Sequence, residues 1–325
     1  MSDLFSDIKD SLERTERKKI VFPEAEDERV LKAACKLADE GLAEPVLIGK
    51  ESKVKQYAKE MEADLQHCFV VDPEEYGGFD QMTEVFVERR KGKVTKAEAE
   101  QLLLEPNYFG TMLVYMEEAD GLVSGAAHST SDTVRPALQI IKTKPGIQRT
   151  SGVFVMVRKE EKYLMGDCAI NIAPSSEELA EIAVESAKTA TLFRIDPRIA
   201  MLSFSTKGSA HSVETDKVEA SVPLALVEDD SLVIDGELQF DAAFVPEVQE
   251  KKAPDSPLKG SANVFIFPSL EAGNIGYKMM ERLGGFEAVG PILQGLQKPV
   301  NDLSRGCSEE DVYKLALITA LQATS

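Results

Sequence analysis

Short apolar segments that alternate with amphipathic helical segments constrain the fold of this chain more than any other feature. Lys19 to Phe22 predicts a short buried strand that ends at Pro23, and Asp27 to Asp39 has apolar residues at helical spacing. Glu44 to Gly49 predicts a second strand, and His67 to Val71 a third. Strands that alternate with helices pair in parallel through crossover helices, so we predict an α/β fold with mostly parallel sheets.

The pattern changes after Lys144-Pro145-Gly146. Two apolar runs between residues 152 and 170 lie close together and predict an antiparallel addition to a second sheet. A chain of 325 residues is expected to form about two domains. We therefore expect an α/β/α domain from residues 1–147 plus 294–325, and another from residues 148–293. An interdomain cleft is where we expect the ligand site, since small-molecule sites concentrate there.

The charge balance limits the partners of this protein. It has 37 Lys and Arg against 56 Asp and Glu, which gives a formal net charge of −19. That surplus of negative charge argues against nucleic acid, because binding phosphate backbones requires a basic surface. It does not exclude an anionic small substrate, which needs only a local cluster of Arg and Lys.

The cysteines, histidines and apolar runs exclude several other classes. The four cysteines, at 35, 68, 168 and 307, are widely spaced, so neither a zinc site nor a disulfide framework is expected. With only three histidines, a multi-histidine metal site is not expected either. The charged N-terminal segment lacks an apolar signal core, and no run reaches the ~20 apolar residues of a membrane span. We expect a cytoplasmic protein without a membrane segment.

A loop of small and hydroxyl residues, Ser124 to Arg135, is a candidate anion site. Small residues such as Gly125 allow close backbone approach, so N–H groups near Ser129 and Thr130 could face an anion at a helix N-terminus. Arg135 could bind phosphate in a bidentate manner. The alternative is an ordinary Ser/Thr-rich loop that caps a helix. The loop matches neither GxxxxGK[ST] nor GxGxxG, so ATP and dinucleotides are not specifically indicated.

A second candidate is Pro268 to Lys278, which follows the apolar run ANVFIF and contains Gly273, Asn274 and Gly276. Ligands of open α/β sheets bind beyond the carboxyl ends of strands, so Asn274 and Lys278 could contact a ligand. The alternative is a strand-to-helix turn that uses glycine for backbone freedom.

A third candidate is Lys298 to Val312, which we expect to form a loop with several reactive side chains. Ser304 and Arg305 fit a helix cap poorly, which favours a functional role. Asp311 could be a catalytic base, or it could be the partner of an N-cap at Ser308. Cys307 could pair with His128 as a nucleophile, although nothing in the sequence favours that over two pocket-lining residues.

Four stretches together resemble the phosphate acetyltransferase (phosphotransacetylase) family. They are SGAAHSTSDTVRPALQIIKTKPG at 124–146, GDCAINIAPSSEELAEIA at 166–183, NVFIFPSLEAGNIGYK at 263–278 and GPILQGLQKPVNDLSRGC at 290–307. The resemblance runs over essentially the whole chain. It implies two α/β/α domains similar to isocitrate and isopropylmalate dehydrogenases, a homodimer, and acetyl transfer between acetyl phosphate and coenzyme A. Coenzyme A is then a substrate, and neither a cofactor nor a metal is implied.

The resemblance also implies roles for particular residues. The family's catalytic serine and arginine fall on Ser304 and Arg305, and its proposed base on Asp311. Its two further substrate arginines fall on Arg90 and Arg135. We expect the thiol of coenzyme A to attack the acetyl carbonyl directly in a ternary complex, without an acetyl-enzyme.

Three other functions are consistent with parts of the pattern. A dehydrogenase of the related fold would need a nicotinamide site and usually several Asp around a metal, and no such Asp cluster is evident. A non-catalytic module that binds coenzyme A would lack thioester formation. A sister transferase for longer acyl phosphates would differ only in pocket volume.

Overall fold

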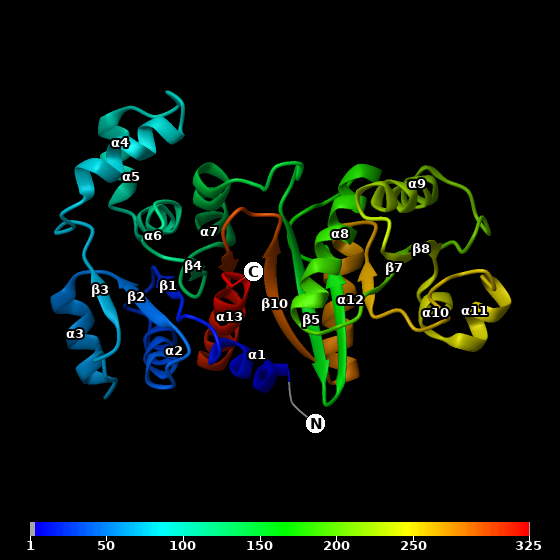
Figure 1. Ribbon diagram of the computed structural model, residues 1–325, viewed down its shortest axis with the longest axis horizontal. Coiled ribbons are helices and arrows are strands. Elements are labelled where there is room, and N and C mark those ends of the chain that lie inside the picture. The colour runs from blue at the N-terminus through cyan, green and yellow to red at the C-terminus, as the bar shows by residue number, and fades with distance from the viewer. Residues whose placement is uncertain (1–3, 325) are drawn as a thin grey trace. The chain divides into compact units, whose positions relative to one another are not determined.

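The computed structural model describes residues 4–324, which form two compact units (Figure 1). We call residues 4–144 with 296–324 the terminal unit, and residues 145–295 the central unit. Each unit has its own mostly parallel sheet with helices on it, so the predicted α/β class is confirmed. None of the helices in this part of the chain has the length and apolarity that crossing a bilayer requires.

The terminal unit contains a five-stranded sheet in the order β11-β4-β1-β2-β3, and every neighbouring pair is parallel. Its strands are β1 (Lys19–Phe22), β2 (Glu44–Ile48), β3 (Phe69–Val71), β4 (Gly121–Ser124) and β11 (Val300–Asp302). The predicted parallel pairing of β1, β2 and β3 is confirmed. The prediction that 298–312 is a loop was wrong at both ends, because β11 lies at its start and pairs with β4, and the last helix begins at Glu309.

The helices of the terminal unit are α1 (Leu4–Leu12), α2 (Glu28–Asp39), α3 (Glu51–Glu60), α4 (Phe79–Arg89), α5 (Lys96–Leu103), α6 (Pro106–Tyr115), α7 (Thr130–Pro136) with its π-helical continuation η1 (Ala137–Ile141), and α13 (Glu309–Gln322). Four of them, α2, α5, α7 and α13, begin at a side-chain cap or capping box. Asp27 caps α2 by accepting from the Arg29 N–H, and Thr95 forms a capping box with Glu98 at the start of α5. Helix α13 packs against α1, α2 and β4, so the last segment of the chain completes this unit.

The central unit contains a six-stranded sheet in the order β10-β5-β6-β9-β7-β8. Its strands are β5 (Ser151–Arg158), β6 (Glu161–Gly166), β7 (Arg198–Leu202), β8 (Val233–Leu238), β9 (Val264–Ile266) and β10 (Glu287–Gln294). β5 pairs antiparallel with β6 and with β10, whereas β6, β9, β7 and β8 pair in parallel. The predicted antiparallel addition is therefore confirmed.

The central unit has five helices among its described residues. They are α8 (Ser176–Leu192), α9 (Val213–Glu228), α10 (Phe240–Phe244), α11 (Pro246–Lys252) and α12 (Leu270–Gly284). The stretch Pro268 to Lys278 is thus mostly helix, and Gly273 lies inside α12. A Cβ at Gly273 would collide with the Asp167 carbonyl oxygen, so this glycine permits close packing of a helix rather than a turn.

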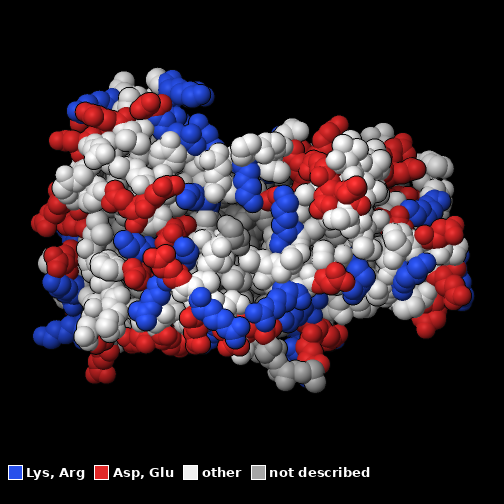
Figure 2. All heavy atoms as spheres, viewed as in Figure 1, with Lys and Arg blue, Asp and Glu red and all other residues white. Residues whose placement is uncertain are grey.

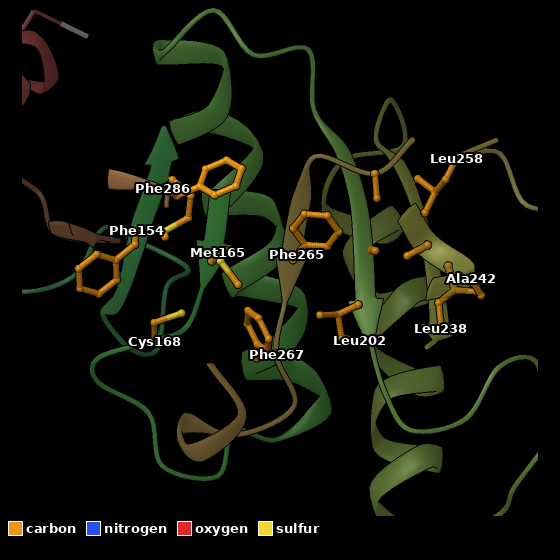
Figure 3. Close-up of a cluster of buried hydrophobic side chains, with 14 of the residues drawn as sticks. Phe154, Met165, Cys168, Leu202, Leu238, Ala242, Leu258, Phe265, Phe267 and Phe286 are labelled. Carbon is orange, nitrogen blue, oxygen red and sulfur yellow. The ribbon is translucent and has the colours of Figure 1, made fainter. Parts of the chain in front are cut away.

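Four phenylalanines belong to one buried hydrophobic cluster of the central unit. Buried side chains from β5, β6, β9 and the segment before β10 form one cluster, which includes Phe154, Met165, Phe265 and Phe286 (Figure 3). Burying a large apolar side chain stabilises a fold by about 1.5–3 kcal/mol. This cluster holds the antiparallel and parallel parts of the sheet in one unit.

Candidate active site

The carboxyl ends of β1, β4 and β11 lie side by side at one edge of the terminal sheet, because these strands are parallel neighbours. The chain leaves β1 toward β2 on one side and later returns to β4 on the other side. In open α/β sheets, ligands bind at such a reversal of strand order. The loops after these strands, at residues 23–27, 125–129 and 303–307, form what we call the edge site.

A buried carboxylate organises the loop after β4. Glu24, which is 5% exposed, accepts hydrogen bonds from the backbone N–H groups of Gly125, Ala126, Ala127 and His128 at 2.8–3.0 Å. Its Oε1 also lies 2.7 Å from Nδ1 of His128. The expectation that N–H groups of this loop face a bound anion is therefore not met at residues 125–128, because their anion is Glu24. Sequence reasoning missed Glu24, since a single Glu after a strand forms no motif.

Arg29 links all three loops. Its guanidinium donates to both carboxylate oxygens of Asp27, at 3.0 and 2.7 Å, and to the Ala126 carbonyl at 2.8 Å. It also donates to the carbonyls of Arg305 at 2.9 Å and Cys307 at 2.8 Å. Arg29 was not among the predicted site residues.

The loop after β11 is a tight turn that presents Ser304 and Arg305. The Leu303 N–H donates to the Ser124 carbonyl, which ties the turn to the end of β4. The Ser304 carbonyl accepts from the Cys307 N–H at 2.9 Å, and its Oγ accepts from the Gly306 N–H at 3.2 Å. Both Ser304 and Arg305 are exposed, so the hydroxyl and the guanidinium can reach a ligand.

Helix α7 begins next to this turn. The N–H and Oγ of Ser129 both donate to Oδ2 of Asp132, at 3.1 and 2.7 Å, so Ser129 caps the helix. Thr130 is exposed at its first turn. Arg135 is also exposed, and its side chain donates to Oγ of Ser131 at 3.2 Å. Arg135 thus lies on an accessible helix surface within the terminal unit.

Arg90 belongs to a basic cluster at the end of α4. Arg89 next to it donates to the carbonyls of Ile140 and Ile141, at 2.7 and 3.0 Å, and is therefore structural. Burial raises the pKa of Tyr108, and Arg135 and Arg90 act in the opposite direction, so both guanidinium groups lie near this phenol. In Figure 2, blue side chains gather at the upper left, over the turn between α4 and α5.

Lys142 belongs to the same cluster. Burial lowers the pKa of its ammonium group, and four neighbouring cations lower it further; these are Arg89, Lys91, Arg90 and Lys93. Cations that lie this close together repel one another, so they favour binding of a polyanion that neutralises their charge.

Asp311 is part of a helix cap, as one of the two interpretations predicted. Its Oδ2 accepts from the N–H and the Oγ of Ser308, both at 2.8 Å, while its own N–H donates to that Oγ at 3.2 Å. No hydrogen bond to Oδ1 is present among the described residues, and the side chain is exposed. The cap therefore leaves one carboxylate oxygen accessible.

The alternative of a Cys307–His128 nucleophilic pair is not supported. Nδ1 of His128 bonds to Glu24, and Sγ of Cys307 lies 3.7 Å from the Arg29 guanidinium. Burial raises the pKa of the Cys307 thiol to about 11, so this thiol is protonated near neutral pH.

Asp302, the last residue of β11, is the second buried carboxyl of the edge site. Burial raises its pKa to about 6, whereas the neighbouring hydroxyls of Thr130 and Thr133 lower it. The negative charge of Glu24 adds to the rise. Asp302 is thus the group of this site that titrates closest to neutral pH among those with a resolved shift.

Asn274 and Lys278 lie on α12 in the central unit. The Asn274 amide donates to the Cys168 carbonyl at 3.2 Å, and the Lys278 ammonium donates to Oδ1 of Asn274 at 2.9 Å. The two side chains therefore form one polar pair on the helix. Within residues 4–324, no group of three or more His, Cys, Asp or Glu side chains is arranged to hold a metal ion.

Comparisons with known proteins support the resemblance seen in the motifs. A family model described as Phosphate acetyl/butaryl transferase matches residues 3–320. The chain is 62% identical to a phosphate acetyltransferase of Bacillus subtilis, over 99% of this chain and 100% of the relative. It is also similar to a solved phosphotransacetylase of Streptococcus pyogenes, with 57% identity, a TM-score of 0.97, and coverage of 100% of this chain and 99% of the other.

A solved EutD phosphotransacetylase of Staphylococcus aureus gives a TM-score of 0.94 at 58% identity, over 99% of this chain and 98% of that one. The resemblance inferred from the four sequence stretches is thereby confirmed. On the near-complete match of the family model and of these relatives, the chain belongs to the phosphate acetyl/butyryl transferase family.

Proposed function

We propose that this chain transfers an acetyl group between acetyl phosphate and coenzyme A by direct attack of the thiol in a ternary complex. The reaction rests on one observation, the 62% identity over 99% of the chain to a protein named phosphate acetyltransferase. The residue roles rest on the edge site, where an exposed serine and arginine follow a buried strand at the reversal of strand order.

The phosphate is bound by side chains. Arg135 and Arg305 are exposed, and a guanidinium can hold two phosphate oxygens at once. Arg90 adds positive charge near Tyr108, which Arg135 also approaches. Neutralising the phosphate makes it a better leaving group when acetyl phosphate is the donor.

Ser304 stabilises the charge that develops on the acetyl carbonyl oxygen. Its Oγ already accepts from the Gly306 N–H, which orients the hydroxyl so that its own proton can point to a ligand. A donor of this kind contributes about 3–4 kcal/mol to the transition state in well-studied oxyanion holes.

Asp311 accepts the thiol proton through Oδ1 while Oδ2 keeps the helix cap. A free thiol has a pKa near ~8.5 and a free Asp near ~3.9, so an unassisted transfer costs roughly 6 kcal/mol. Cations beside the thiol and exclusion of water on ligand binding reduce this gap.

The phosphates of coenzyme A bind to the basic cluster of Arg90, Lys91, Lys93 and Lys142, which has the charge that a polyphosphate requires. Ser129, Thr130, Asn274 and Lys278 supply further substrate contacts. Coenzyme A acts as a substrate, and the mechanism uses no cofactor or metal.

The protein acts as a cytoplasmic homodimer. One face of α12 exposes Ile275, Met279 and Leu283 at helical spacing, and Leu283 is 81% exposed. An exposed apolar stripe of this kind is typical of a protein–protein contact. Light scattering on the parent and on Leu283→Lys tests this: a dimer that dissociates in the variant supports the assignment of the face.

Thioester formation from acetyl phosphate and coenzyme A, followed by ultraviolet absorbance, tests the function. Arg305→Ala and Arg135→Ala should each lower kcat/KM by about 100-fold or more while circular dichroism stays unchanged. Arg158→Ala is the matched control, because Arg158 is an arginine of the central unit that pairs with Glu161. Near-parent rates in both site variants would refute the assignment, and an acetylated Cys307 trapped during turnover would refute direct transfer.

A further inference from the structure

Arg29 uses every donor of its side chain on the protein. A guanidinium has five N–H groups in a rigid plane. In this structure Nε donates to Asp27, Nη2 donates to Asp27 and Ala126, and Nη1 donates to the carbonyls of Arg305 and Cys307. No donor is left for a substrate, so Arg29 differs in kind from the exposed Arg135 and Arg305.

The partners of Arg29 come from three separate segments. Asp27 is the N-cap of α2, Ala126 follows β4, and Arg305 and Cys307 flank the turn after β11. Asp27 anchors the guanidinium through both of its oxygens, and the Arg29 guanidinium lowers the pKa of that carboxyl. The anchored plane then aims its remaining N–H groups at three carbonyl oxygens.

This geometry fixes the turn that carries Ser304. The carbonyls of Arg305 and Cys307 lie one and three residues after Ser304, and both are held by Nη1. Glu24 holds the facing loop at residues 125–128 independently. Catalytic groups must be held within about 0.5 Å of their productive position, which an exposed turn does not achieve by itself.

We propose that Arg29 is a positioning residue for acetyl transfer: anchored by Asp27, it holds the Ser304–Cys307 turn against the loop after β4. The proposal rests on the proposed function, and it assigns Arg29 no contact with substrate. Arg29 acts through Ser304 and Arg305.

The principal test is Arg29→Lys. Lysine keeps the charge, but a single ammonium cannot reproduce five donors in one plane. We expect kcat for acetyl transfer to fall by about 10- to 100-fold, with a smaller change in the KM of coenzyme A. Arg158→Lys is the matched control, since Arg158 also pairs with a carboxylate and donates to a carbonyl, that of Gly284. It should retain parent kcat.

A double-mutant cycle separates positioning from a merely structural role. Because Arg29 acts in part through Ser304, Arg29→Lys should lower kcat by a clearly smaller factor in a Ser304→Ala background than in the parent. Equal fold-losses in both backgrounds would overturn the proposal. Asp27→Asn, which removes the anchor and keeps Arg29, should lower kcat in the same direction by a smaller factor, and it carries the test if Arg29→Lys does not fold.

These measurements separate the acetyl transfer activity from the positioning role of Arg29. An inactive parent would refute the proposed function and the positioning role together. An active parent with an impaired Ser304→Ala and a fully active Arg29→Lys would refute only the positioning role.

Discussion

Each unit of this molecule contains a buried carboxylate that makes five hydrogen bonds, four of them with backbone N–H groups. In the terminal unit, Glu24 accepts from four backbone N–H groups and from the His128 ring. In the central unit, Asp167 accepts from the N–H groups of Gly152, Ala169, Ile170 and Asn171, and from the Asn171 amide.

The two carboxylates differ in what surrounds them. The Glu24 loop continues into half-buried Ser129 and exposed Thr130 and is tied by Arg29 to an exposed turn. The Asp167 loop is covered by α12, whose Gly273 packs on the Asp167 carbonyl. The same hydrogen-bond pattern therefore lies beside exposed polar residues in one unit and beneath a packed helix in the other.

Removing either carboxylate should lower the stability of the protein more than any other substitution considered below. Glu24→Gln and Asp167→Asn each turn an acceptor into a donor facing buried N–H groups, which should cost about 3–5 kcal/mol of unfolding free energy. Urea unfolding measures this loss. Acetyl transfer per folded molecule should fall at least about 10-fold for Glu24→Gln only. Equal losses of kcat in the two variants would contradict a functional difference between the two buried carboxylates.

Asp302, the second buried carboxyl of the edge site, should make the stability of the protein depend on pH. The pKa of Asp302 is raised from 3.8 to about 6, so the folded state favours its protonated form. Its contribution to stability is present at low pH and is lost as pH rises through about 6, by about 3 kcal/mol in total. Unfolding measured at several pH values should show Asp302→Asn gaining stability relative to the parent as pH rises. A constant difference would contradict the raised pKa.

Each unit also has a glycine that allows close packing beside its buried carboxylate loop. A Cβ at Gly125, where φ is +112°, would lie 2.6 Å from Oδ1 of Asp302 and from the Leu303 carbonyl oxygen. At Gly273 it would meet the Asp167 carbonyl. Gly125→Ala and Gly273→Ala should each cost about 1–3 kcal/mol in thermal or urea unfolding. Only Gly125→Ala should also lower kcat, because it displaces the residue before Ser304; an unchanged kcat would count against the edge site.

Removing either of two matched helix caps, one in each unit, should lower the stability least. Ser308 caps α13 with Asp311, and Ser175 caps α8 with Glu178 in the same way. Ser308→Ala and Ser175→Ala should each lose about 1 kcal/mol of stability. If Asp311 is the base, Ser308→Ala alone should also change the pH profile of kcat. Identical profiles would leave Asp311 with the cap as its only role.

The sequence predicted regular elements better than polar or glycine-containing ones. β1, β2 and the β5–β6 pair follow hydrophobic patterns and appear where expected. β11 was missed because Asn301 and Asp302 are polar. Asn301 is buried nevertheless, because its amide donates hydrogen bonds to Thr319 and Gln322. Strand β10 was missed because Gly290-Pro291 interrupts it at a shift in register.

The candidate site was predictable where its polar residues lie close together in the sequence. Ser304, Arg305 and Arg135 were singled out from their loops, the family resemblance added Arg90, and the structure places all four in one unit. Glu24 and Arg29 were missed because their partners lie about 100 and 280 residues away in the sequence, respectively. No local pattern encodes contacts of that range, which depend on the order of strands in the sheet.

The terminal unit is built from two segments separated by the whole central unit, and this affects folding during synthesis. Strand β11 and helix α13 are translated after the central unit, yet β11 pairs with β4 and α13 packs on α2, both of which are translated before it. Domains generally fold as their residues become available. The central unit can therefore fold first, while the edge of nascent β4 that β11 later covers stays unpaired until β11 is translated.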